Sequence, residues 1–196
     1  MALLTRSELL RDLPRGEERV KIAAARAVLL VEATSAPADA TFDIFLSHSS
    51  KYPREVRAIK RYLERLGFTV YVDWIEDEEL DRSAVTPATA DRLRHRITSS
   101  RSLLVHATEG AVMSRWVPWE LGFADGLGCS VGILPILAES RHTSIYKGVE
   151  YMGLYPYVDF AQAAGTDVTQ AWVNRSSKTY VSFNAWLEGT QPFRRT

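Results

Sequence analysis

An acidic residue that follows two tryptophans is the strongest candidate for chemistry in this sequence. The segment Ser114-Arg-Trp-Val-Pro-Trp-Glu120 places Glu120 in the opening turns of a helix, with Trp116 and Trp119 just before it. Large flat rings beside a single carboxylate are typical of a nucleoside pocket. We expect at least one ring to pack in the core and assign Trp116 to the pocket. A structural alternative stays open, because an acid near a helix N-terminus also complements the helix dipole by about 0.3 to 1 kcal/mol.

Further polar residues follow the predicted strands. In a doubly wound sheet, ligands bind beyond the carboxyl ends of the strands, where the winding reverses. This rule brings the residues after the first two strands to the same edge as the segment from His106 to Glu120. The residues predicted to contact a substrate are Ser47, His48, Ser49, Ser50, Asp73, Trp74, Ser114 and Trp116. As alternatives, the serine run is a turn that caps the next helix, and Asp73 anchors the acidic loop that follows it.

Strands alternate with helices in the main part of the chain. Apolar, β-branched and aromatic runs predict strands, and apolar residues three and four apart predict helices. The predicted strands are Phe42 to Ser47, Phe68 to Val72, Ser102 to Ala107, Val131 to Ile136 and Tyr155 to Phe160. The predicted helices run through Val56 to Leu66, from Thr86-Pro87 to near Ser99, from near Pro118 to Gly128, and from Thr179 to Leu187. This pattern predicts an α/β fold, a flavodoxin-like doubly wound five-stranded parallel sheet of order 2-1-3-4-5.

A short helical extension precedes this domain. Thr5 with Glu8 three residues later is typical of a capping box for one helix, and an Ala-rich second helix follows Pro14-Arg-Gly16. The small, polar, Pro-containing segment 34–41 predicts a boundary, which divides the chain into an extension over 1–40 and a domain over 41–196. The extension has apolar positions that need a partner surface, so we expect it to dock or dimerise and to take no part in chemistry.

Composition and charge exclude several classes of protein. The 196 residues carry 24 Lys and Arg against 24 Asp and Glu, so no overall field draws the molecule to nucleic acid or to a membrane. One cysteine, Cys129, builds no disulfide framework, and four scattered histidines lack metal-ligand spacing. The longest nearly apolar run, 23–31, is shorter than the roughly 20 residues of a membrane span. We therefore expect a cytoplasmic protein without a metal.

Three motifs for other activities fail on their context. The glycines of Gly126-Leu-Gly128-Cys-Ser-Val-Gly132 precede a strand, whereas those of a dinucleotide-binding turn follow one. No GxxxxGK[ST] sequence for a phosphate-binding loop is present. A hydrolase triad of Ser47, His48 and Asp73 is disfavoured, because neighbouring residues of a strand point in opposite directions.

Three segments together carry a resemblance to a known family. Phe42-Asp-Ile-Phe-Leu-Ser-His-Ser-Ser, Gly67-Phe-Thr-Val-Tyr-Val-Asp and Ser114-Arg-Trp-Val-Pro-Trp-Glu-Leu121 resemble, in this order, a prokaryotic Toll/interleukin-1 receptor (TIR) domain. The resemblance implies a flavodoxin-like fold and cleavage of NAD at its nicotinamide–ribose bond, with Glu120 catalytic and Trp116 four residues before it. It also implies a role in bacterial antiviral defence of the Thoeris-like type, through cyclic or linear ADP-ribose signals.

The resemblance implies partners as well. NAD is then the substrate and no separate cofactor is needed. A homo-oligomer formed through TIR–TIR contacts and a downstream effector that senses the nucleotide product are expected. The chain departs from the familiar pattern in the acidic loop 75–83, which lacks a Pro-Gly pair, and in its N-terminal helices.

The chemistry of NAD explains why one carboxylate suffices. Ordinary glycosidases need a second carboxyl group to protonate the leaving oxygen. Nicotinamide in NAD is already cationic and leaves as a neutral base, so a single ionised Glu can stabilise the positive transition state. Two rival functions remain open at this point: a non-catalytic TIR scaffold, and a nucleoside 2-deoxyribosyltransferase, which also uses a Glu at a ribosyl carbon.

The acidic loop predicts a mode of assembly. It holds Glu76, Asp77, Glu78, Glu79 and Asp81, whereas the first two helices of the main domain have a surplus of Arg and Lys. Acidic and basic patches on one molecule favour a head-to-tail contact, which forms filaments unless it closes into a ring. The alternative is a solvated loop whose acids pair locally, at about 0 to 1 kcal/mol each.

Overall fold

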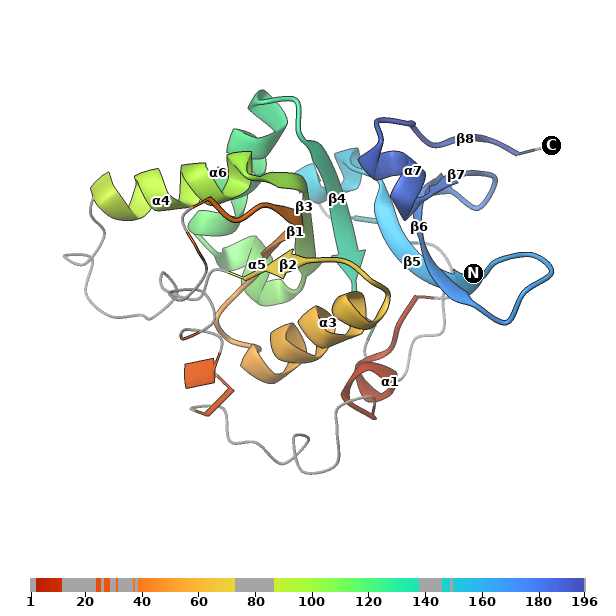
Figure 1. The fold of residues 1–196 in the computed structure, drawn as a ribbon, viewed down its shortest axis with the longest axis horizontal. Coiled ribbons are helices and arrows are strands. Elements are labelled where there is room, and N and C mark those ends of the chain that lie inside the picture. Colours follow the sequence, from red (N-terminus) through yellow and green to blue (C-terminus); the bar gives the residue numbers. More distant parts are fainter. Residues whose placement is uncertain are drawn as a thin grey trace.

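The computed structural model describes residues 3–11, 39–72, 87–137, 146–148 and 150–195, together with residues 24, 25, 27, 28, 31 and 37. The described part forms one sheet with helices on both faces (Figure 1). Its strands are β1 (Phe42–Ser47), β2 (Val70–Tyr71), β3 (Ser100–Ala107), β4 (Ser130–Pro135), β5 (Tyr157–Gln162), β6 (Thr169–Ser176), β7 (Thr179–Ser182) and β8 (Phe193–Arg194). Its helices are α1 (Arg6–Arg11), α3 (Pro53–Arg65), α4 (Pro87–Thr98), α5 (Glu109–Met113), α6 (Trp116–Gly126), α7 (Phe183–Leu187) and the 3-10 helix η2 (Glu150–Leu154).

The first five strands form a parallel sheet of order β2-β1-β3-β4-β5, which confirms the predicted flavodoxin-like arrangement. Continuous apolar runs suit strands that are covered on both faces. Leu103, Leu104 and Val105 of β3, for example, are all at most 1% exposed. The carboxyl ends of β1, β3 and β4 therefore meet at one edge of the sheet, and the loops after them form the candidate site.

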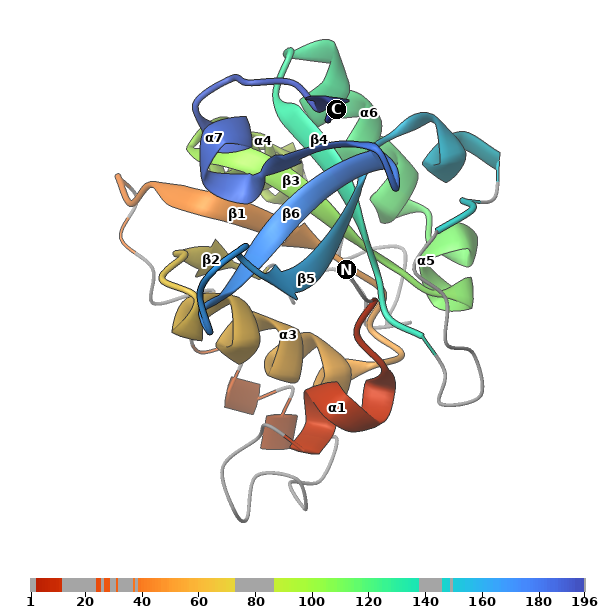
Figure 2. The same ribbon diagram turned by 90° about the vertical axis from the view of Figure 1, so that its right-hand side faces the viewer.

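Beyond β5 the structure differs from the prediction. Three more strands, β6 to β8, continue the sheet in antiparallel fashion (Figure 2). The predicted helix over Thr179 to Leu187 is wrong in its first half, because β-branched and aromatic residues of this segment pair with β6 as strand β7. The helix α7 begins only at Phe183, where the Ser182 hydroxyl accepts a hydrogen bond from the Ala185 N–H at 3.4 Å.

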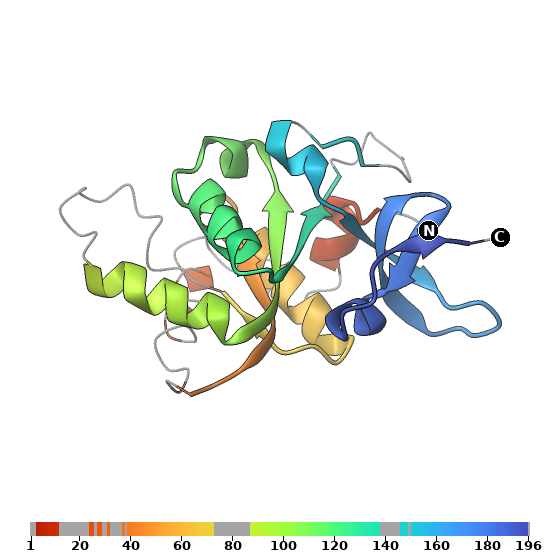
Figure 3. The ribbon, with the colours of Figure 1, turned by 90° about the horizontal axis from the view of Figure 1, so that it is seen from above.

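Alternate residues of the strands supply two separate cores. Ile44 and Leu46 of β1 pack with α3, α1 and α7 on one face. Phe45, between them, packs with α4, α5 and α6 on the other face. Figure 3 shows these two layers of helices on either side of the sheet. The side chain of each residue at the end of β1 consequently faces one of these two helical layers.

The start of the chain packs onto this domain. The predicted capping box is confirmed, since the Thr5 N–H donates to Glu8 Oε2 at 2.9 Å and the Glu8 N–H donates to Thr5 Oγ1 at 3.3 Å. Leu9 of α1 is 1% exposed, and the Arg6 N–H donates to the Leu137 carbonyl at 2.8 Å. The partner surface that the sequence predicts for the apolar residues of the extension is, for Leu9, the core of the same chain. Most of the second predicted N-terminal helix lies outside the described residues, as does the acidic loop.

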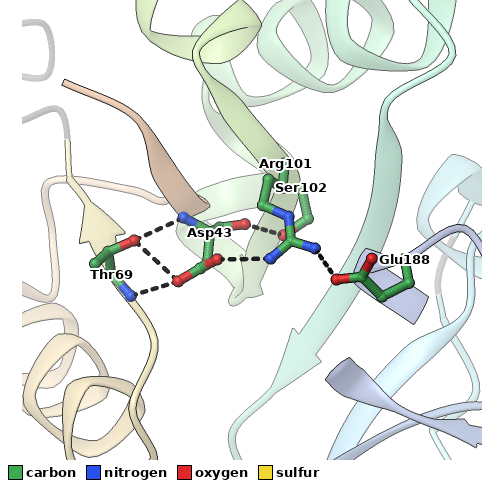
Figure 4. Close-up of polar contacts among 5 residues, drawn as sticks. All are labelled: Asp43, Thr69, Arg101, Ser102 and Glu188. Carbon is green, nitrogen blue, oxygen red and sulfur yellow. Dashed lines mark hydrogen bonds and ion pairs between the residues drawn. The ribbon is translucent and has the colours of Figure 1, made fainter. Parts of the chain in front are cut away.

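An ion-pair network joins strands at the opposite, amino end of β3. Arg101 contacts the Asp43 carboxylate at 3.1 Å and also donates to Glu188 beyond α7 (Figure 4). The Thr69 N–H donates to Asp43 Oδ2 at 2.9 Å, and the Ser102 hydroxyl donates to the Asp43 carbonyl at 2.7 Å. This network holds β1, β2 and β3 in register at the edge away from the candidate site.

Candidate active site

Glu120 and Ser47 meet on the α6 face of the sheet. Glu120 lies one turn into α6 and is 6% exposed, and Ser47 ends β1 with 1% exposure. The Ser47 hydroxyl donates a short hydrogen bond to Glu120 Oε2. The structure thus brings together two of the residues that the sequence places at the carboxyl edge, although they are 73 positions apart.

The start of α6 fixes the two tryptophans. The Ser114 hydroxyl caps this helix by accepting hydrogen bonds from the N–H groups of Trp116 at 3.2 Å and Val117 at 3.3 Å. Trp119 stacks on Phe123 with ring centroids 5.6 Å apart, which gives it a packing role. Trp116 contacts Trp119 edge to face and is half-buried, one turn before Glu120 on the same side of the helix. Trp116 therefore has a face that can meet a ligand ring, whereas Ser114 already serves as a cap.

The loop after β1 is closely packed. His48 and Ser49 are 7% and 4% exposed, and Ser50 is half-buried. The His48 Nδ1–H donates to the Leu46 carbonyl at 3.0 Å, because a carbonyl can only accept. A Cβ on Gly110 would come within 2.6 Å of Ser49 Oγ, so α5 can approach the loop this closely only through a glycine. The loop is thus held by a hydrogen bond to the β1 backbone and by the close approach of α5.

A second group of polar side chains lies behind this loop on the α3 face. His106 of β3 is fully buried, and its Nε2 lies 3.8 Å from Glu55 Oε2 of α3. Glu55 in turn forms a 2.7 Å ion pair with Arg6 of α1. Burial lowers the pKa of His106 to about 3, and the nearby His48 adds to this shift. Burial raises the pKa of Glu55, against the opposing effect of the Arg6 charge.

The sequence reasoning did not identify Arg6 or Glu55. A signal for Glu55 was present, because it precedes Ile59 by four positions and Leu63 by eight and so belongs to the buried stripe of its helix. An acid in an apolar stripe indicates a buried partner. Arg6 carries no comparable signal, since its partner lies on a different helix.

Asp73 and Trp74, which the sequence predicts to contact the substrate, fall outside the described residues, so their contacts stay predictions. A cavity of about 380 Å³ lies near Cys129, Tyr155 and Arg175, at the opposite edge from Glu120. No cluster of three potential metal ligands occurs within the described ranges, nor does any helix there have the length and apolarity to cross a membrane.

Comparison with known proteins decides the family. A profile of the TIR domain matches residues 44–173. The chain belongs to the TIR domain family. It is 47% identical over 147 residues to "Probable 3' cyclic ADP-D-ribose synthase ThsB'" of Bacillus cereus (strain MSX-D12), which covers 75% of this chain and 76% of that relative. It is also 29% identical over 99 residues to "Putative cyclic ADP-D-ribose synthase TIR2" of Cytobacillus dafuensis, which covers 50% of this chain and 26% of that relative.

Proposed function

We propose that this TIR domain cleaves the nicotinamide–ribose bond of NAD and closes the remaining ADP-ribose into a cyclic nucleotide, a signal in bacterial antiviral defence. The observation that carries the proposal is Glu120, a buried carboxylate at the switch point of the sheet, with the Ser47 hydroxyl bound to it. Trp116 one turn away supplies a flat apolar surface for a ring. The names of both relatives, each a cyclic ADP-D-ribose synthase, support the same chemistry.

The reaction needs only one acidic group. When the bond from C1 of the ribose to the nicotinamide nitrogen breaks, the bonding electrons leave with nicotinamide, which becomes neutral. Positive charge then develops on the ribose, and the Glu120 carboxylate stabilises it. A preorganised charge in a site that excludes water is effective because little solvent screens it.

Ring closure uses a hydroxyl group of the same nucleotide. Its oxygen attacks C1 from the open face, and Glu120 accepts the proton that the hydroxyl loses. We assign this role to the 3′ hydroxyl of the adenosine ribose, following the product in the name of the Bacillus cereus relative. Attack by water in place of this hydroxyl gives linear ADP-ribose, so exclusion of water by the packed loop after β1 favours the cyclic product.

The remaining parts of the proposal concern substrate contacts and partners. Ser47, His48, Ser49, Ser50, Asp73, Trp74, Ser114 and Trp116 are proposed to line the NAD site. We propose that the protein works in the cytoplasm without a further cofactor. Head-to-tail contacts between TIR domains and an effector that senses the cyclic product complete the proposal.

Substitution of Glu120 by Gln tests the proposal. This change removes the charge and keeps the side-chain volume, so NAD turnover should fall at least about a hundredfold, on the order of 3 kcal/mol, while the melting temperature stays nearly constant. Chromatography and mass spectrometry of NAD incubated with pure protein would measure both rate and product. Glu109→Gln, which neutralises an exposed acid of α5, is the matched control and should keep wild-type turnover.

Three results would contradict this function. Turnover of Glu120→Gln within a few-fold of wild type would remove the carboxylate from the mechanism. An inert wild-type protein, tested over a range of concentrations, would instead favour a scaffold. Transfer of a deoxyribosyl group between bases, with NAD untouched, would favour the transferase.

A further inference from the structure

Arg6, Glu55, His106 and His48 form a line of polar side chains from the molecular surface to the candidate site, which we term the α3-face cluster. Arg6 is half exposed on α1 and pairs with Glu55 at 2.7 Å. Glu55 faces His106 at 3.8 Å, and His106 interacts electrostatically with His48. The line crosses α1, α3, β3 and the end of β1. The line ends at His48, the neighbour of Ser47 in the chain.

Ser47 and His48 connect the two faces of the sheet through one peptide bond. Side chains of successive strand residues point to opposite faces. Ser47 accordingly binds Glu120 on the face where Phe45 packs, whereas the alternation places His48 with Leu46 on the α3 face, the face of His106. The hydrogen bond from His48 Nδ1 to the Leu46 carbonyl ties the imidazole to the backbone of β1. A shift of His48 must therefore move the backbone that carries the Ser47 hydroxyl.

The α3-face cluster is costly for stability, which indicates a role other than stabilisation. His106 is 0% exposed, and neither of its ring nitrogens has a hydrogen-bond partner among the described residues. A buried polar group without a partner costs about 1 to 3 kcal/mol. The separation of 3.8 Å from Glu55 is too long for a hydrogen bond. An apolar residue at position 106 would extend the core formed by Leu46 and Leu104.

We propose that Arg6, Glu55 and His106 are positioning residues that hold His48, and through the shared backbone Ser47, in the geometry that NAD cleavage requires. This inference rests on the proposed function. It makes α1 part of the catalytic unit, in contrast to the expectation that the N-terminal segment takes no part in chemistry. Displacements of about 1 Å in a catalytic geometry can reduce rates up to a hundredfold, so a weak contact at Arg6 is sufficient for a measurable effect.

The first test changes Arg6, which is exposed enough to be replaced without loss of the fold. Arg6→Gln should lower kcat/KM for NAD about fivefold and shift the melting temperature by less than about 3 °C, since partly exposed ion pairs contribute little to stability. Arg6→Lys keeps the positive charge and should restore at least half of the wild-type value. Arg101→Gln removes an ion pair of similar exposure at the other end of β3 and should leave kcat/KM within twofold.

The second test separates positioning from stability. His106→Leu keeps the volume approximately and removes the unpartnered imidazole, so the variant should be at least as stable as wild type but about tenfold lower in kcat/KM. A double-mutant cycle of Arg6 and Ser47 then tests whether the effect on catalysis is transmitted through Ser47. If the cluster acts through Ser47, Arg6→Gln should cost less than twofold in a Ser47→Ala background, compared with about fivefold in wild type.

The possible results are distinguishable. Unchanged kcat/KM in both Arg6→Gln and His106→Leu would overturn the inference, and so would full additivity of Arg6→Gln with Ser47→Ala. If wild-type protein fails to cleave NAD, the proposed function fails. Nuclear magnetic resonance of the imidazoles then tests whether the α3-face cluster holds His48. Arg6→Gln should shift the His48 ring signals while Arg101→Gln does not, and unshifted signals would overturn the inference independently of turnover.

Discussion

The hydroxyl of Ser47 is the feature of the site that a single substitution tests most directly. It is buried, ends a strand and donates to the carboxylate that we place in catalysis. A hydrogen bond to a charged group contributes about 1.5 to 3 kcal/mol, so Ser47→Ala should lower kcat roughly tenfold to a hundredfold. Ser102→Ala, which removes a buried serine hydroxyl at the other end of the sheet, is the matched control. Steady-state NAD kinetics at saturating substrate would measure the difference, and equal kcat for the two variants would show that Ser47 only fills space.

At this scale the sequence predicts which residues gather, and fails to predict their individual contacts. The switch-point rule places Ser47, His48 and Glu120 at one edge, and the structure brings them there. The rule does not show that Ser114 caps α6, because a serine before a helix suits capping and ligand binding equally well. The side chains of Ser47 and His48 point to opposite faces of the sheet, which argues against a catalytic triad. The same arrangement links the two faces through the backbone of β1.

Among the secondary-structure elements, β5 contains a buried acid at an unexpected place. Asp159 is 1% exposed, and burial raises its pKa from 3.8 to about 6, although the nearby polar side chain of Asn174 opposes the shift. The folded state thus binds this proton more tightly than the unfolded state. The stabilisation is therefore complete below about pH 4 and is lost as the pH rises through 6.

This linkage gives a prediction for unfolding at different pH values. Asp159→Asn imitates the protonated acid, so it should be more stable than wild type above pH 6, by up to about 3 kcal/mol, and equal to it below about pH 4. Urea unfolding between pH 4 and 8 would measure the difference. Asp167→Asn, which changes an exposed acid in the turn before β6, should show no such dependence. A constant difference at every pH would show that the charge of Asp159 is not involved.

The prediction of elements from sequence succeeds where the pattern of one strand or helix is sufficient. The bounds of β1 agree with Phe42 to Ser47, and α3, α4 and α6 lie where apolar spacing predicts helices. Strands β6 and β7 were missed because their stability comes from pairing with β5 and with each other. Thr179 to Leu187 has a mixed pattern, and only the ladder opposite β6 shows that its first four residues are extended.

For the whole molecule, the charge distribution leads to the last prediction, which concerns the proposed head-to-tail assembly. Five basic residues of α3 are candidates for the partner of the acidic loop over 75–83: Arg54, Arg57, Lys60, Arg61 and Arg65. If such a contact sets the position of the loop next to the site, specific activity should rise with protein concentration. Salt should oppose the rise, because the screening length falls from about 8 Å at about 0.15 M to about 3 Å at about 1 M.

A charge reversal separates this contact from general repulsion. Replacing Glu76, Glu78 and Glu79 with Lys should abolish the dependence on concentration and imitate high salt in wild type. Replacing Asp39, Glu109 and Asp167 with Lys changes the net charge equally on exposed positions outside the loop and should leave the dependence intact. Sedimentation velocity measured beside NAD turnover would report both assembly and activity. A specific activity that is independent of concentration, salt and loop charge would contradict assembly through this loop, because an electrostatic contact between exposed groups must respond to screening.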